Sequence, residues 1–171
     1  MSQNVHVIRR IKMTDVSFLL SYPIYRDFEP GDIDVLSQIC EAEKHGDKDV
    51  IFKAGGPGSA MYIIKSGTVK IWIETDKRRK QVALLSDGEF FGEMSLIDNS
   101  PRSATVTAEG DTELVRLSLD GFARLKSEFS STGFKVVGVL LKFMAARIRR
   151  TTKKAAELIK GRKKRRNARK K

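Results

Sequence analysis

The 171-residue chain has a single cysteine, Cys40, and it lacks any apolar run long enough to cross a bilayer. One cysteine cannot form a disulfide within the chain, and it excludes an iron–sulfur cluster or a multi-cysteine zinc site supplied by this chain alone. The most apolar stretch, residues 134–146, is interrupted by Lys135 and Lys142, and no apolar segment opens the chain. We therefore expect a soluble cytosolic or nuclear protein, with the cytoplasm as the assigned compartment.

Proline is also scarce: 4 prolines against 13 glycines exclude collagen-like and proline-rich chains, and 40% hydrophobic residues are typical of one globular domain. The net charge of +12 is distributed unevenly. Residues 142–171 contain 15 lysines and arginines and one acid, Glu157, whereas residues 1–141 contain 18 basic and 20 acidic residues. The excess positive charge therefore belongs to the C-terminal end, and the rest of the chain is not a polyanion binder by composition.

Helical spacing marks both ends of the expected fold. Asp32 is placed to cap a helix whose apolar positions are Ile33, Leu36, Ile39 and Cys40. Ser118 is placed to cap a short helix through Phe122 and Leu125. A longer helix follows, with an apolar stripe at heptad spacing formed by Phe134, Val137, Leu141, Met144 and Ile148. This stripe either packs the helix onto the domain or forms the seam of a homodimer through Phe134–Ile148.

Between these helices the apolar period changes to two. Val69, Ile71 and Ile73 alternate with polar or exposed positions, which predicts half-buried strands. Turn residues divide residues 49–118 into about eight short segments. We therefore predict an α+β fold: a β-roll or jelly roll of about eight antiparallel strands, with an N-terminal helical segment and two C-terminal helices.

Residues 90–105 interrupt the alternation, although strands flank them on both sides. Gly92 followed by a helical turn over residues 93–98 exposes backbone N–H groups that attract an anion. Arg102, fixed between Pro101 and a strand, can present a bidentate guanidinium to phosphate oxygens. Glu93 beside an anion site needs a separate role, and accepting hydrogen bonds from a sugar hydroxyl is such a role. The segment predicts a phosphate-plus-ribose ligand, and a structural Glu93–Arg102 ion pair is the alternative.

The segment resembles the phosphate-binding cassette of the cyclic nucleotide-binding domain family, found in catabolite-activator-type regulators, regulatory subunits of cyclic-nucleotide-dependent kinases and nucleotide-gated channels. The resemblance runs from about Phe18 to Arg150. It rests on two groups of residues: Val50-Ile51-Phe52, Gly55, Gly58, Met61-Tyr62-Ile63-Ile64, Ser66-Gly67 and Val69, then Phe91-Gly92-Glu93 and Pro101-Arg102-Ser103-Ala104-Thr105. One departure is Lys48, which directly precedes Asp49 where the family usually has glycine, and it leaves the local turn open.

The resemblance implies a cyclic nucleotide site formed by Phe91, Gly92, Glu93, Met94, Ser95, Arg102, Ser103, Ala104 and Val82. Arg102 would pair with the exocyclic oxygens of the cyclic phosphate. Glu93 and the Gly92 backbone would bind the ribose 2′-hydroxyl.

The other members of this set would surround the phosphate and the base. Backbone N–H groups near Ser95 and Ala104 would complete the phosphate cradle, Ser103 would lie near phosphate and base, and Val82 would form a wall of the base pocket. Serine after the arginine favours cyclic AMP. Cyclic GMP stays the alternative, because one hydroxyl contributes only about 1 kcal/mol.

The sequence contains no paired-carboxylate site, nucleophile–base arrangement or Walker-type loop, so we expect neither an enzyme nor a metal or other cofactor. The 23 residues after Ile148 are too few for a winged helix-turn-helix. We expect a stand-alone cyclic-nucleotide sensor that signals to an unidentified effector protein through rearrangement of its C-terminal helix.

The predicted organisation is an N-terminal extension over residues 1–16, the binding domain over 17–154 and a basic tail over 155–171. Within the tail, Lys160–Lys171 hold nine positive charges in twelve residues, which predicts a disordered segment or a frayed helix end. The alternative function is a tether to nucleic acid or an anionic membrane through this segment, with the β-roll as a scaffold.

Overall fold

The computed structural model describes residues 13–75 and 78–168, without the side chains of residues 154 and 158–168. The elements, in chain order, are η1 (Ser17–Ser21), η2 (Pro23–Tyr25), α1 (Pro30–Ile39), β1 (Glu41–His45), β2 (Val50–Phe52), β3 (Ala60–Thr75), β4 (Arg78–Ser86), β5 (Phe90–Phe91), α2 (Glu93–Asp98), β6 (Thr105–Ser118), α3 (Leu119–Ser127) and α4 (Ser130–Ala168). The chain divides into two compact units at Gly133. No helix among the described residues is both long and apolar enough to span a membrane.

The described part of the first unit contains one antiparallel sheet of six strands. Its order is β1-β6-β3-β4, with β2 paired to β6 and β5 paired to β3. The antiparallel roll is therefore confirmed, but the strands are fewer and longer than the turn residues predicted. The glycines at two expected turns, Gly67 (φ 100°) and Gly110 (φ 72°), lie inside β3 and β6, where the ladder shifts register. A bulge accommodates each expected turn without ending the strand.

The core of the roll is built from alternate strand positions. Its buried members are Ala60, Tyr62, Ile64, Val69, Leu85, Phe91, Val106 and Leu114. Tyr62 and Phe91 stack with their ring centroids 5.3 Å apart, and Phe52 packs against both rings. Aromatic pairs of this kind contribute about 0.5–1.5 kcal/mol beyond their buried area. The rings of Phe52, Tyr62 and Phe91 form a rigid aromatic floor beneath the segment that follows β5.

The turn before β2 forms although Lys48 stands where the family usually has glycine. Lys48 adopts a left-handed backbone with φ 67°. Its N–H donates to the carbonyl of Ala108, and the N–H of Asp49 donates to the carbonyl of Gly46, both at 3.1 Å. The turn therefore forms, with lysine in a conformation that favours glycine.

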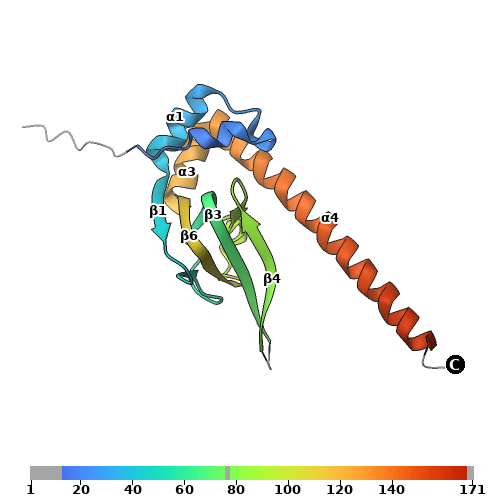
Figure 1. The fold of residues 1–171 in the computed structure, drawn as a ribbon. Helices are drawn as coiled ribbons and strands as arrows, with labels where there is room; N and C mark the ends of the chain where they lie inside the picture. The colour runs from blue at the N-terminus through green and yellow to red at the C-terminus, as the bar shows by residue number, and fades with distance from the viewer. Residues whose placement is uncertain (1–12, 76–77, 169–171) are drawn as a thin grey trace, which may run out of the picture. The chain divides into compact units, whose positions relative to one another are not determined.

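Helices α1 and α3 lie together beyond one end of the strands, as Figure 1 shows. The predicted start of α1 was wrong: Glu29 is the N-cap, and Asp32 is the third helical residue of a capping box. The Ser118 cap is confirmed, since its hydroxyl accepts a hydrogen bond from the N–H of Gly121. A Cβ on Gly121 would lie 2.8 Å from the Cγ2 of Ile39, so glycine allows α3 to approach α1 closely.

The 39-residue helix α4 begins in the first unit and makes up the described part of the second. Its backbone stays helical to Ala168, where composition predicted a disordered or frayed end. Lysine and arginine have high helix propensity, which is compatible with this continuation. The apolar stripe does not provide the buried apolar positions: Phe134, Leu141 and Ile148 are exposed, while the buried apolar side chains are Val136, Val139 and Leu140.

Candidate functional site

Arg102 is the central residue of the candidate site. Its side chain is 4% exposed, and its guanidinium lies 4.1 Å above the ring of Phe52. Nη1 donates to the carbonyl of Gly92 at 2.9 Å, and Nη2 donates to the carbonyl of Ala60 at 2.6 Å. The Arg102 backbone is also fixed, because its N–H and carbonyl bond to Gly56 and Gly55 of the preceding loop. The first residue of β3, the loop at residues 55–56 and the ring of Phe52 thus hold the cation in place.

The guanidinium of Arg102 is incompletely hydrogen-bonded. Among the residues that the structure describes, its Nε is buried and has no hydrogen-bond partner. Burial lowers the pKa of Arg102, although the nearby Tyr62 and Glu93 act in the opposite direction. A buried unsatisfied donor on a cation costs free energy. A bound phosphate oxygen would supply the missing acceptor and the opposite charge.

The turn from β5 into α2 positions Glu93 beside this cation. Gly92 is the N-cap of α2 and has φ 78°, a left-handed conformation that permits the sharp turn. A Cβ at Gly92 would lie 2.7 Å from Nη1 of Arg102, so only glycine leaves room for the guanidinium. Glu93 and Ser95 then fall in the first turn of α2, and both are buried. The helical turn predicted over residues 93–98 is therefore present with the expected bounds.

Apart from Phe91, the remaining expected site residues form a more exposed border. Phe91 is buried in the aromatic core, whereas Met94 is exposed on α2. The Ser103 hydroxyl donates to the sulfur of Met94 at 3.9 Å, which connects the two sides of the cassette. Ala104 is half-buried next to the start of β6.

Val82, the expected wall of the base pocket, lies on β4 and is 42% exposed. Ile71 pairs with Ala83 and Trp72 pairs with Gln81, so Val82 is the extra residue of a bulge. The bulge leaves an apolar side chain accessible on the edge strand. Its role as a pocket wall stays a prediction.

The sequence did not identify Phe52 and Ala60 as partners of Arg102. Phe52 supplies the ring beneath the guanidinium, and Ala60 supplies a carbonyl from 42 residues away in the chain. Gly58 is a further support, because a Cβ there would overlap the side chain of Ser95. The glycine-rich composition of residues 55–58 was the available signal for this close packing.

A pocket of about 500 Å³ borders the same loop. Its lining residues are Gly55, Gly56, Pro57, Gly58, Ser59, Asn99, Pro101 and Leu119. None of these carries a charged side chain, so this pocket does not replace Arg102 as the candidate anion site.

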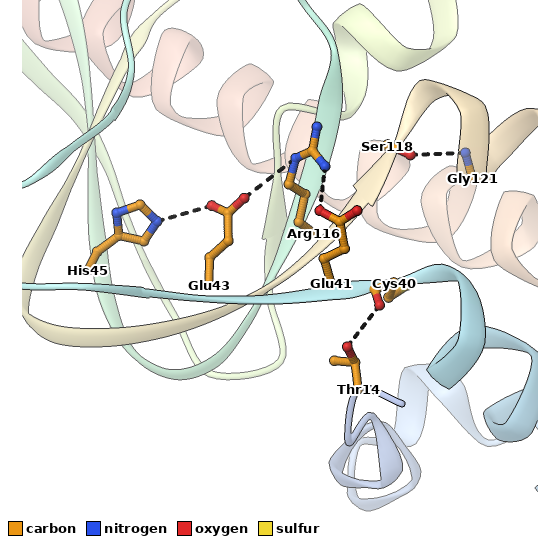
Figure 2. A network of polar contacts seen from close by, with 8 residues as sticks. All are labelled: Thr14, Cys40, Glu41, Glu43, His45, Arg116, Ser118 and Gly121. Atoms are coloured by element: carbon orange, nitrogen blue, oxygen red, sulfur yellow. Dashed lines mark hydrogen bonds and ion pairs between the residues drawn. The ribbon is translucent and has the colours of Figure 1, made fainter. Parts of the chain in front are cut away.

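A polar network on β1 and β6 leads toward the aromatic floor. Figure 2 shows Arg116 between Glu41 and Glu43, with Nη1 2.8 Å from Glu41 Oε2 and Nε 3.5 Å from Glu43 Oε1. His45 lies 3.2 Å from the second oxygen of Glu43. Burial raises the pKa of Tyr62, while Arg116 opposes this rise. The charged network therefore borders the Tyr62 ring that packs against Phe52 and Phe91.

Comparison with known proteins identifies the family of the chain. Residues 43–129 match the family described as the cyclic nucleotide-binding domain, and this match covers half of the chain. The chain belongs to the cyclic nucleotide-binding domain family. Most of the β-roll, the helical turn after Gly92 and the buried Arg102 lie within the matched range.

Two curated proteins illustrate this relationship. A cAMP-dependent protein kinase regulatory subunit of Hypocrea atroviridis is 33% identical over 109 residues, which are 64% of this chain and 23% of that protein. The cyclic AMP receptor protein of Thermus thermophilus is 33% identical over 104 residues, 60% of this chain and 48% of that protein. The chain thus spans about a quarter of the first relative and about half of the second.

Solved structures give the same result for the fold. A cyclic nucleotide-binding domain from Methylobacillus flagellatus has a TM-score of 0.74 at 26% identity, covering 81% of this chain and 82% of that one. The catabolite activator protein of Thermus thermophilus has a TM-score of 0.69 at 29% identity, covering 80% and 63%. The regulatory domain of Toxoplasma gondii PKA, crystallised with cAMP, has a TM-score of 0.63 at 26% identity, covering 77% and 48%.

Proposed function

We propose that the chain is a sensor that binds a 3′,5′-cyclic nucleotide, cyclic AMP in the first instance, with Arg102 on the cyclic phosphate. The observation that carries this proposal is the buried guanidinium, which has an unsatisfied Nε and neutral carbonyl partners. A phosphate would supply both an oxygen acceptor for the unpartnered Nε and a negative charge. The names of the relatives, a cAMP-dependent kinase regulatory subunit and a cyclic AMP receptor protein, support cyclic AMP as the ligand.

The neighbouring residues have distinct roles in this proposal. Glu93 and the Gly92 backbone bind the ribose 2′-hydroxyl, and backbone N–H groups near Ser95 and Ala104 complete the phosphate cradle. The neutral base then lies along the exposed border formed by Ser103, Met94 and Val82. This division fits the burial pattern, since Glu93 and Arg102 are buried while the border is exposed.

Ligand-dependent thermal stabilisation tests the role of Arg102. Cyclic AMP at about 100 times its dissociation constant should stabilise the wild-type protein by roughly 2.7 kcal/mol. Arg102→Ala should remove this stabilisation, because truncating one partner of a desolvated charged pair costs about 2–5 kcal/mol of binding. Arg124→Ala is the matched control, because Arg124 is an exposed arginine on α3. Equal stabilisation of the wild type and Arg102→Ala would overturn the proposal.

We further propose that nucleotide binding repositions α4 and that the chain signals to an effector protein through this helix, without catalysing a reaction itself. A ligand shifts such an equilibrium only through contacts that differ between the two states. Hydrogen exchange over residues 130–150, measured with and without cyclic AMP, should therefore differ. Identical protection would exclude this mode of signalling while leaving the binding proposal intact.

A second candidate function is a tether to nucleic acid or an anionic membrane through Lys160–Lys171, side chains that lie outside the described residues. The observation that favours it is the 15 basic residues against one acid in residues 142–171. Retention on heparin, RNA or anionic vesicles should then fall with salt and disappear when residues 160–171 are deleted. Absence of retention at low salt would reject the tether.

A further inference from the structure

An exposed apolar stripe runs along α4. Phe134 is 80% exposed, Leu141 is 62% exposed and Ile148 is 64% exposed. Their spacing of seven residues keeps successive side chains within about 20° of one line along a helix. We call these three residues the α4 stripe. Large apolar side chains in such a line are the usual knobs of helix–helix packing.

Small residues separate the members of the α4 stripe. Gly138 follows Phe134 by four positions and Ala145 follows Leu141 by four, so both lie on the same helix face. A Cβ built at Gly138 would meet nothing within 4 Å. The face therefore alternates large side chains with small residues, which suits the interdigitation of a second helix.

A basic residue directly follows each member of the α4 stripe. These residues, Lys135, Lys142 and Arg149, form a row parallel to the stripe because they share its seven-residue spacing. The stripe thus has a positively charged border along its length. In paired helices, charges beside the apolar seam select the partner.

The charge pattern disfavours a second copy of this chain on the stripe. Residues 134–153 contain six basic residues and no acidic residue. Two copies would bring like charges together along their whole contact, and juxtaposed like charges oppose association. A membrane surface is also a poorer match, because an interfacial helix needs a broad apolar face and this stripe has one large side chain every two turns.

We propose that the α4 stripe binds a helix of a partner protein whose own heptad seam is bordered by aspartate and glutamate. The partner's apolar side chains fill the positions at Gly138 and Ala145, and its carboxylates pair with the basic row. This inference rests on the proposed function in one respect: the partner helix is taken to belong to the effector protein. The contact itself needs no cyclic nucleotide.

A designed helix provides the test. The probe is a synthetic three-heptad peptide with leucine at both seam positions and glutamate at both flanking positions, whose like charges keep it from pairing with itself. The full chain should bind this peptide, with affinity that falls as salt rises, and should bind the same peptide with lysine at the flanking positions at least about tenfold more weakly.

Two matched pairs of variants locate the contact. Leu141→Asp should weaken binding about tenfold or more, while Ala146→Asp adds the same charge at an exposed position off the stripe and should not. Likewise Arg149→Glu should weaken binding, and Arg150→Glu, a change of the adjacent residue on another face, should have a smaller effect. No binding of the acidic peptide, or equal effects within each pair, would overturn the proposal.

Two further measurements identify a wrong occupant. In sedimentation of the chain alone, the wild type should show no dimer that is lost in Leu141→Asp. Such a dimer would mean that a second copy of the chain occupies the α4 stripe. Phosphatidylserine vesicles should not compete with the peptide for the surface at Leu141. Cyclic AMP affinity, measured in the same variants, should be unchanged. If the wild type binds the peptide but not cyclic AMP, the proposed function is rejected and the helix-binding proposal stands.

Discussion

The hydroxyl of Thr132 donates a 2.7 Å hydrogen bond to the Oδ1 of Asp32, and both side chains are buried. Asp32 belongs to α1, where its other oxygen accepts a hydrogen bond from the N–H of Glu29. Thr132 lies in the first turn of α4, within the first unit. One carboxylate therefore caps α1 and fixes the start of α4, the helix that we propose transmits the signal.

Thr132→Val should lower the free energy of unfolding by about 1–3 kcal/mol, because it retains the shape of the side chain but leaves a buried carboxylate oxygen without this donor. Urea denaturation measures the loss. Ser131→Ala, at an exposed position in the same turn, should change stability little. Equal stability of wild type and Thr132→Val would show that Thr132 is dispensable for holding this turn.

Lys48→Gly should stabilise the protein by about 1 kcal/mol, because a left-handed backbone costs an ordinary residue roughly that amount. The N–H that bonds to Ala108 is retained in glycine, and the exposed ion pair with Asp47 contributes little. Asn99→Gly, at φ 56°, is the comparison, and its gain should be smaller because asparagine tolerates this region. A destabilised Lys48→Gly protein would contradict this account of the turn.

Gly58→Ala should destabilise the fold and weaken nucleotide binding, since its Cβ would overlap the side chain of Ser95 on α2. Gly31→Ala, where a Cβ meets nothing within 4 Å, should leave both properties nearly unchanged. Thermal melting with and without cyclic AMP compares the two variants. Similar melting temperatures for both would show that α2 can move away from the loop without cost.

Cys40 should be unreactive in the native protein. Burial raises the pKa of its thiol to about 12 from 9.0, with a smaller contribution from Glu41. At about pH 8 a thiol reagent should therefore modify the native protein at least about 100-fold more slowly than the urea-unfolded protein. Because only the unfolded thiol ionises between about pH 9 and 12, the free energy of unfolding should fall as the pH rises through this range. Rapid native modification would contradict this burial.

Local signals in the sequence predicted the elements near the site well. The Ser118 cap and the helical turn after Gly92 depend on residues within a few positions, so their patterns are visible in the chain. The strand count was not predicted, because Gly67 and Gly110 lie in bulges rather than turns. Whether a glycine ends a strand or bends it depends on pairing with another strand, which the local sequence does not specify.

The same limit applies to the candidate site. The cassette motif predicted Arg102 and Glu93 as a pair with distinct roles, and the structure brings both into one buried region. It did not predict that Phe52 and Ala60 hold the guanidinium, because β2 and β3 reach Arg102 only through the folded sheet. Exposure of the α4 stripe was also hidden, since a heptad pattern does not distinguish a packed face from an open one.

Calorimetric titration of the full chain with cyclic AMP tests the central claim most directly. We predict saturable binding of one nucleotide per chain, weaker binding of cyclic GMP and much weaker binding of 5′-AMP, which lacks the cyclic phosphate. Binding should disappear in Arg102→Ala at the same ligand concentrations and persist in Arg124→Ala. Absence of binding to the wild-type chain, or equal affinity in Arg102→Ala, would contradict the account.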